Sequence, residues 1–163
     1  MLADLISGEL PYLRRYARAL LGTRSAGDAA VETMLETKML ILLNEGRTPA
    51  QRKDLFRALD ETIMEELSKG KLNQEVAKIL RRMTTDERRA VMLTAVEGFS
   101  IFEAAEILGA PTNFVEQALV SAETSLKSAL ATTVLIIEDE VLISELLASI
   151  VLEAGHSVLG VAT

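Results

Sequence analysis

Two adjacent acidic residues, Glu138 and Asp139, follow directly after the apolar run Val134–Ile137. A short β-branched run of this kind is typical of a strand buried on both faces of a parallel sheet, and ligands bind at the carboxyl ends of such strands. Carboxylate oxygens are the ligands that a hard divalent cation such as Mg²⁺ prefers. We therefore take Glu138 and Asp139 as candidate metal ligands, with the alternative that they only keep the strand end hydrated.

The residues after this pair predict the elements that would position it. Gly155 is expected to end a helix, and Val158–Val161 has the pattern of a second apolar strand. Strand, helix and strand make a parallel βαβ unit, which predicts the incomplete start of a doubly wound α/β domain. The apolar face of the helix is formed by Ile143, Leu146, Leu147, Ile150 and Val151.

Composition excludes several other kinds of chemistry. The chain has no cysteine and a single histidine, so disulfides, thiolate metal sites and histidine-based catalysis are not expected. No nucleophile–base pairing is visible in the sequence, and we expect no enzyme activity. No run of about 18 apolar residues is present, so no membrane span is expected. The acidic start is unlike a signal peptide, and a cytoplasmic protein is expected.

Charge divides the chain into two parts. Residues 132–163 hold five acids and no lysine or arginine, whereas residues 1–131 hold 19 acids and 17 bases, out of totals of 24 and 17. A step from balanced charge to purely acidic charge is typical of a domain boundary.

The front of the chain has the spacing of helices with clear start and stop signals. Pro11 is expected to open a first helix that Gly22 ends, Ser25–Asp28 resembles a capping box for a second, and Thr48 with Pro49 is expected to start a third. The apolar stripes of these helices are Leu13, Tyr16, Ala17, Leu20 and Leu21, then Val31, Met34, Leu35, Met39 and Leu42, then Leu55, Leu59, Thr62, Ile63 and Leu67.

A second group of helices follows. After a short helix from Val76 to Met83, Thr84–Glu87 and Ser100–Glu103 have the form of capping boxes, Gly109 predicts a tight turn, and Thr112 is expected to begin the next helix. Helix, glycine turn and helix is the signature of a helix-turn-helix. Many helical hairpins share this signature and bind no nucleic acid, so that alternative stays open.

These patterns together predict a mostly α fold in four segments. The first is a helical bundle over residues 1–67 and the second a linker over residues 68–75. A second helical bundle is expected over residues 76–130. The incomplete βαβ unit is expected over residues 132–163.

Both bundles resemble parts of small extracytoplasmic-function sigma factors. The resemblance to region 4 is carried by the elements Glu87-Arg88, Glu97-Gly98-Phe99-Ser100, Glu103-Ala104-Ala105 and Ile107-Leu108-Gly109. The stretch LPYLRRYARALLGTRSAGDAAVETML is similar to the start of region 2.

The charges of the helix-turn-helix differ from those of a DNA-binding protein. Residues 100–130 hold four acids and one base, Lys127. A helix that enters the major groove needs lysine or arginine for phosphates, and a negative surface is repelled by DNA. Asn113 and Gln117 could contact bases, but they lack such phosphate anchors. We therefore expect the sigma-like fold without DNA binding.

The tail resembles the opening of a response-regulator receiver, in the segment VLIIEDE. The resemblance implies that Asp139 is a direct Mg²⁺ ligand, with Glu138 standing where Asp is more common. A complete receiver would bind Mg²⁺ and carry a phosphoryl-accepting aspartate after its third strand. This chain stops after the second predicted strand, so we expect no phospho-acceptor and no bound cofactor in it.

A sigma-like part followed by a receiver resembles the PhyR family of anti-anti-sigma response regulators. The resemblance implies partner switching in two-component general stress signalling, in which a phosphorylated receiver frees the sigma-like part to capture an anti-sigma factor of the NepR type. It implies a cognate sensor histidine kinase as a further partner of a full-length protein, and it does not identify the residues that contact the anti-sigma factor. The alternative is a genuine extracytoplasmic-function sigma factor or another helix-turn-helix transcription regulator.

Overall fold

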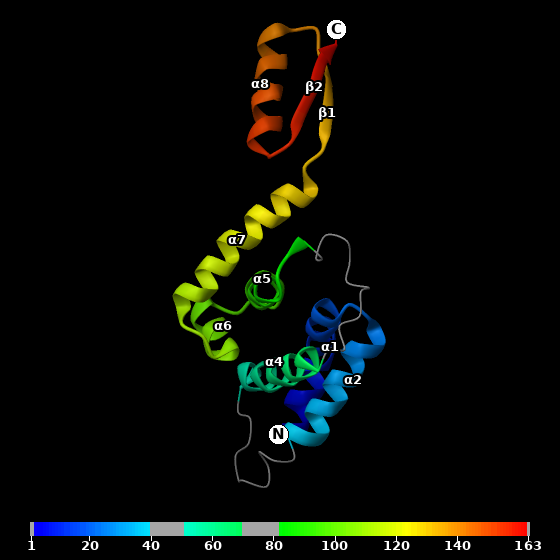
Figure 1. Cartoon of the computed structure of the whole chain (residues 1–163), viewed down its shortest axis with the longest axis vertical. Helices are drawn as coiled ribbons and strands as arrows, with labels where there is room; N and C mark the ends of the chain where they lie inside the picture. The colour runs from blue at the N-terminus through cyan, green and yellow to red at the C-terminus, as the bar shows by residue number, and fades with distance from the viewer. Residues whose placement is uncertain (1, 40–50, 70–81, 163) are drawn as a thin grey trace.

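The computed structural model describes residues 2–39, 51–69 and 82–162. It is mostly helical and ends in a small parallel sheet, which confirms the expected fold class (Figure 1). The elements are α1 (Leu2–Leu21), α2 (Arg24–Met34), the π-helical segment η1 (Leu35–Met39), α4 (Arg52–Ser68), α5 (Thr85–Val91), the π-helical segment η3 (Met92–Val96), α6 (Ile101–Leu108), α7 (Thr112–Leu130), β1 (Thr133–Ile137), α8 (Val141–Glu153) and β2 (Ser157–Ala162).

The first helix is longer than its sequence signals predicted. Pro11 lies inside α1, which already begins at Leu2, so the prediction that Pro11 opens the helix was wrong. Proline removes one backbone donor from a helix interior. Leu5, Ile6 and Leu10 pack against the core, and burial of these side chains offsets that loss.

The second helix uses a different cap from the one predicted. Thr23 is the N-cap of α2, and its hydroxyl oxygen accepts a hydrogen bond from the Ala26 N–H at 3.0 Å. The predicted capping box Ser25–Asp28 was therefore wrong. The Asp28 carboxylate accepts instead from Arg18 of α1, with Nη2 at 2.7 Å from Oδ1, so it joins two helices rather than capping one.

The helix over residues 52–68 begins later than predicted. Gln51 is its N-cap, and the Gln51 N–H donates to the Asp54 carboxylate at 3.0 Å. The proposed start at Thr48 and Pro49 was wrong for this helix, and those two residues lie outside the described part of the chain. Leu42, Gly46, most of the predicted linker 68–75 and the predicted helix start at residues 76–81 also lie outside it, and the predicted domain limits stay a prediction.

The helix caps and the turn of the second group of helices were predicted correctly. Thr84–Glu87 and Ser100–Glu103 both form reciprocal capping boxes, at the starts of α5 and α6. Gly109 ends α6 in the left-handed conformation, with φ of 61°. Residues with a Cβ atom rarely adopt this conformation, whereas glycine does so readily. Gly109 therefore makes the turn that sets α7 against α6.

The two groups of helices share one hydrophobic core. Phe56 of α4 lies edge-on to Tyr16 of α1, with ring centroids 5.6 Å apart, and edge-on to Phe99, which precedes α6, at 5.0 Å. Such edge-to-face pairs add to the stabilisation that burial gives. Further buried members include Leu13, Leu20, Met34, Leu55, Leu59, Ile63, Leu93, Ile107 and Val115. The helical body is thus held together across its middle.

The C-terminal unit lies beyond the end of α7, away from this body (Figure 1). β1 and β2 pair in parallel, in register Val134↔Val158 and Ile136↔Val161, with α8 packed on them, as predicted. Apolar side chains remain exposed on this unit, for example Ile137 at 75% and Leu142 at 80%. No helix in the described ranges is long and apolar enough to span a membrane.

Candidate functional site

The acidic pair lies where the sequence predicted it, at the carboxyl end of β1. The Glu138 N–H donates to the Ala162 carbonyl at 2.9 Å, which places the pair beside the end of β2. The Glu138 carboxylate accepts from the Glu140 N–H at 3.0 Å, and Asp139 is exposed. The donors are of the type that Mg²⁺ prefers. Within residues 2–39, 51–69 and 82–162, however, no three acidic or histidine side chains are grouped as a metal site requires, so the metal assignment stays a prediction.

The outer face of α7, where a DNA-binding helix would carry its contacts, is acidic and polar. Asn113, Glu116 and Gln117 are exposed along it. The single base of residues 100–130, Lys127, is already paired with Glu123 one turn earlier, with Nζ 2.8 Å from Oε1. The helix therefore offers one exposed base for phosphate contacts, against the two exposed acids Glu116 and Glu123.

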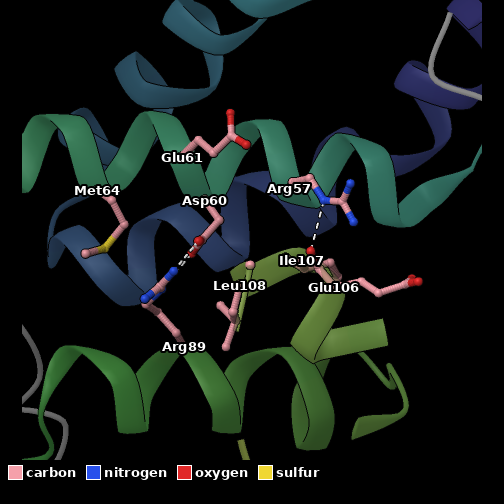
Figure 2. A pocket seen from close by; sticks show the side chains of 9 residues that line it. Arg57, Asp60, Glu61, Met64, Arg89, Glu106, Ile107 and Leu108 are labelled. Carbon is pink, nitrogen blue, oxygen red and sulfur yellow. Dashed lines mark hydrogen bonds and ion pairs between the residues drawn. The ribbon is translucent and has the colours of Figure 1, made fainter. Parts of the chain in front are cut away.

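A cavity of about 510 Å³ lies between α4 and the turn that follows α6 (Figure 2). The cavity lies where the two groups of helices meet, because one wall comes from α4 and the other from α5 and α6. The lining residues are Arg57, Asp60, Glu61, Met64, Arg89, Glu106, Ile107, Leu108 and Gly109, and we call this space the junction groove.

The inner wall of the junction groove is a buried ion pair. Asp60 of α4 is 2% exposed, and its Oδ1 accepts from Arg89 Nε at 2.9 Å and from the Tyr16 hydroxyl at 2.7 Å. Burial, together with the neighbouring Asp60 charge, raises the pKa of Tyr16 well above its usual value, so the phenol stays a donor. Arg89 also contacts Asp86, which completes its charge-assisted bonds.

The rim of the junction groove combines charge with apolar surface. Arg57 Nε donates to the Glu106 carbonyl at 2.9 Å, near the carboxyl end of α6, where a cation is favoured by the helix dipole (Figure 2). Lys53 Nζ lies 2.6 Å from the Glu106 carboxylate. Met64 and Leu108 are half-buried and supply apolar lining. The groove thus combines apolar side chains with charged ones, a mixture that suits an amphipathic helix.

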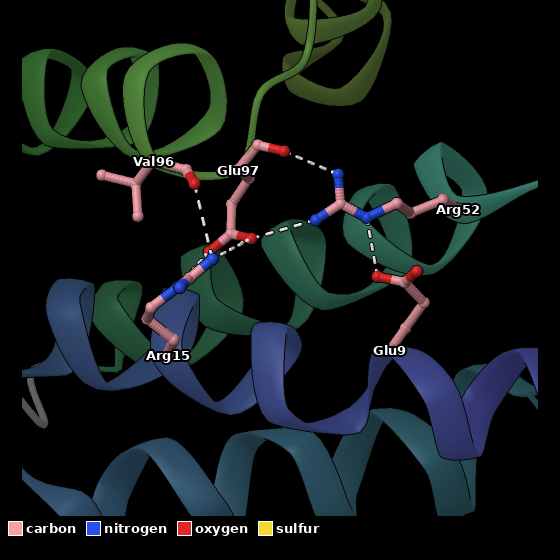
Figure 3. Close-up of polar contacts among 5 residues, drawn as sticks. All are labelled: Glu9, Arg15, Arg52, Val96 and Glu97. Carbon is pink, nitrogen blue, oxygen red and sulfur yellow. Dashed lines mark hydrogen bonds and ion pairs between the residues drawn. The ribbon is translucent and has the colours of Figure 1, made fainter.

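A second polar cluster joins the two groups of helices on another side (Figure 3). Glu97, from the Glu97-Gly98-Phe99-Ser100 element, accepts hydrogen bonds from Arg15 of α1 and from Arg52 of α4. Glu9 accepts from the same Arg52. This element was part of the resemblance to sigma factors, and here it connects the two groups of helices. We call these groups, residues 2–68 and 82–130, the two halves of the helical body.

Sequence reasoning left the partner-binding residues unidentified and did not single out Asp60 or Arg89. A signal for Asp60 was available, because Phe56 and Ile63 place it on the apolar stripe of its helix, and a carboxylate on a buried face requires a paired cation. Nothing in the sequence pattern pointed to Arg89 as that cation, since the two residues are 29 positions apart.

Two family models match the helical part of the chain. The sigma2 domain of PhyR matches residues 6–60, and the sigma-like domain of the response regulator PhyR matches residues 80–128. The phyllosphere-induced regulator PhyR of Methylorubrum extorquens is 41% identical over 170 residues, which cover 98% of this chain and 62% of that protein.

Solved structures of PhyR proteins are also similar to this chain. The co-crystal structure of the anti-anti-sigma factor PhyR with the anti-sigma factor NepR, from Bartonella quintana, shares 33% identity over 99% of this chain and 64% of that chain, with a TM-score of 0.78. A crystal structure of PhyR from the same organism shares 29% identity over 99% of this chain and 61% of that chain, with a TM-score of 0.61.

The chain spans less than two thirds of the length of these relatives. Models of one family match both groups of helices, and the βαβ unit aligns along with them. The chain belongs to the PhyR family.

Proposed function

We propose that the chain is an anti-anti-sigma factor, a sigma-factor mimic whose helical body sequesters an anti-sigma factor of the NepR type in the general stress response. The observation that carries this proposal is the junction groove, which is lined by both sigma-like halves and has the amphipathic character that a partner helix needs. The chain acts through binding rather than catalysis.

The similarity to the PhyR–NepR co-crystal structure supports this proposal. The TM-score is 0.78 for that complex and 0.61 for the other PhyR crystal structure from the same organism. The arrangement of elements in this chain is thus nearer to that of a relative in contact with an anti-sigma factor. A binding surface already arranged in this way loses little free energy to reorganisation when the partner arrives.

The junction groove takes the apolar side of a partner helix in this proposal. Met64 and Leu108 contact its apolar residues, while Arg57 and Glu61 pair with polar groups along its edges. The acidic outer face of α7 keeps the chain off promoter DNA, so the mimic does not compete with the true sigma factor for its promoters.

Control by phosphorylation is the second part of the proposal. In a complete receiver, Glu138 and Asp139 would hold Mg²⁺ through their carboxylates, and a sensor histidine kinase would supply the phosphoryl group. The metal would neutralise the charge of the incoming phosphoryl group. The position of the pair at the carboxyl end of β1 supports this role.

Calorimetric titration with the NepR-type anti-sigma factor of the same genome tests the function. We expect a 1:1 complex. Met64→Asp should weaken it by about tenfold or more, because a carboxylate would be buried against the partner. Val120→Asp on the exposed face of α7 is the matched control and should bind like the parent chain. Absence of a complex, or equal weakening by both substitutions, would contradict the proposal.

A further inference from the structure

The Glu97 carboxylate is enclosed although it is charged. Its side chain is 0% exposed, and it lies between two arginines that come from the other half of the helical body (Figure 3). Arg15 of α1 donates through Nε and Nη2, each at 2.9 Å, one to each carboxylate oxygen. Arg52 of α4 donates to Oε2 at 3.0 Å. Both oxygens are thus satisfied by groups of residues 2–68.

Arg52 is itself fixed in place from several directions. It donates to the Glu97 carbonyl at 2.7 Å and to the Glu9 carboxylate at 2.6 Å. Its guanidinium lies over the rings of Phe56 and Phe99, at 4.9 and 4.5 Å from their centroids. A planar guanidinium held by stacking and by charge-assisted bonds has little freedom to follow a moving partner.

Charge in this cluster is balanced, with two arginines against Glu9 and Glu97. A rotation of one half against the other that is too small to admit water would move the Glu97 carboxylate away from both arginines and leave a buried charge unpaired. Removing the partners of a buried charge is far more costly than the net stabilisation that the pair provides. The cluster therefore penalises other orientations of the halves more strongly than it stabilises the observed one.

Among the described residues, two further ion pairs join the halves. The buried pair Asp60–Arg89 acts in the same direction as the Glu97 cluster, whereas the exposed pair Lys53–Glu106 provides an internal comparison. Lys53 pairs with Glu106, whose side chain is 51% exposed. Exposed pairs contribute little and exchange readily with water. Breaking that pair leaves no buried charge, so it does not define the orientation in the way the Glu97 cluster does.

We propose that Glu97 is a positioning residue that fixes the orientation of residues 82–130 against residues 2–68, and so holds the junction groove in one shape. The link to partner affinity rests on the proposed function, whereas the orientation itself does not. Glu97 lies outside the groove lining and acts on the partner only through the geometry of that groove.

Distance measurements test the orientation directly. The chain has no cysteine, so spin labels can be placed cleanly at Glu32→Cys on α2 and Gln117→Cys on α7, both exposed positions. We expect one narrow distance distribution in the parent and a broader one in Glu97→Gln, in which the shared core and the Asp60–Arg89 pair still join the halves, with the helical content unchanged. Glu106→Gln, the exposed pair, should keep the narrow distribution. Should Glu97→Gln fail to fold, Arg15→Gln leaves Arg52 on the carboxylate and should give partial broadening. A narrow distribution in Glu97→Gln, or in Arg15→Gln, overturns the proposal.

Binding kinetics separate positioning from direct contact. If only about a tenth of Glu97→Gln molecules have the competent orientation, the apparent Kd rises about tenfold. That loss should lie in the association rate, with the dissociation rate unchanged, whereas Met64→Asp should raise the dissociation rate. A faster dissociation as the main effect of Glu97→Gln overturns the positioning role. If the parent binds no anti-sigma factor, the proposed function fails, and the distance measurement alone decides the role of Glu97.

Discussion

Arg89 of α5 lies against Asp60 of α4 in the interior of the helical body, with its Nε 2.9 Å from the Asp60 Oδ1. The same carboxylate oxygen accepts from the Tyr16 hydroxyl of α1 at 2.7 Å. One buried carboxylate therefore joins three helices, two from the first sigma-like half and one from the second. The contact forms the inner wall of the junction groove, so stability and the shape of the binding surface depend on the same residues.

Replacing Asp60 should destabilise the chain strongly. Asp60→Ala leaves Arg89 buried without its main partner, and we expect a loss of about 3–5 kcal/mol in the free energy of unfolding. Tyr16→Phe removes one hydrogen bond and keeps the ring, so it should cost about 1 kcal/mol. Urea unfolding followed by circular dichroism measures both. A loss below 1 kcal/mol for Asp60→Ala would contradict the assigned pairing.

The contact between α5 and α7 should depend on pH. The Ser121 hydroxyl donates to the Glu87 carboxylate and lowers its pKa below the usual 4.5, against the effect of burial, and the Thr84 N–H adds to the lowering. Because the pKa is lower in the folded chain, the stabilisation is present above the unfolded pKa and is lost as pH falls through the folded value. Ser121→Ala should cost about 1 kcal/mol at pH 7 and progressively less as the pH falls through the folded pKa of Glu87.

Ser128→Ala, an exposed serine on the same helix, serves as the control for that measurement and should change neither the stability nor its pH dependence. Thermal melts at pH 7, 5 and 3 provide the comparison. A cost for Ser121→Ala that rises as the pH falls would show that the charged form of Glu87 is not what the hydroxyl stabilises.

Local signals in the sequence predicted the caps and the turn of the second group of helices, whereas the predicted starts of α1, α2 and α4 were wrong. Thr84, Ser100 and Gly109 act within one helical turn, and each has the cap or turn role that its type and spacing predicted. The start of α1 was wrong because burial of Leu5 and Leu10 against the core outweighs the loss at Pro11, and no local pattern reports that packing. Tertiary contacts override local preference in this way wherever an apolar face is available.

The candidate site was less accessible to sequence reasoning than the fold. Glu138 and Asp139 follow a strand directly, so their place at its carboxyl end could be predicted. The junction groove depends on Asp60 meeting Arg89 and on Glu97 meeting Arg15, which are 29 and 82 positions apart. Pairings over such separations arise from how helices pack, which periodicity within each helix does not specify.

Promoter DNA should not bind specifically to this chain. The exposed face of α7 carries Glu116, and its one base, Lys127, is paired with Glu123. Phosphate contacts provide most of the non-specific affinity of DNA-binding proteins, and residues 100–130 have a single base to supply them. Fluorescence titration with labelled sigma-type promoters at low salt is the measurement. A sequence-dependent Kd near ~10⁻⁸ M would revive the alternative of a genuine sigma factor or other DNA-binding regulator.

Mg²⁺ should bind to this chain only weakly. Glu138 and Asp139 provide two carboxylates, and one of them already accepts a backbone hydrogen bond from Glu140. A protein site for Mg²⁺ is nearly octahedral, and ligands that are few and exposed compete poorly with water. Titration followed by NMR shifts of residues 133–162 should give no saturation below millimolar Mg²⁺. Saturation in the micromolar range that Asp139→Ala abolishes would show a formed site.

Binding of the anti-sigma factor should not require phosphorylation of this chain. The β1–α8–β2 unit lies beyond the far end of α7, whereas the junction groove lies between α4 and α6, so the unit does not cover the groove (Figure 1). A ligand shifts a conformational equilibrium only by its differential affinity for the two states. Calorimetric titration of the anti-sigma factor into this chain, with no phosphoryl donor present, should therefore give a complex. Asp139→Ala should leave the Kd unchanged. A Kd that changes with Asp139→Ala would mean that the acidic strand end controls the groove from a distance.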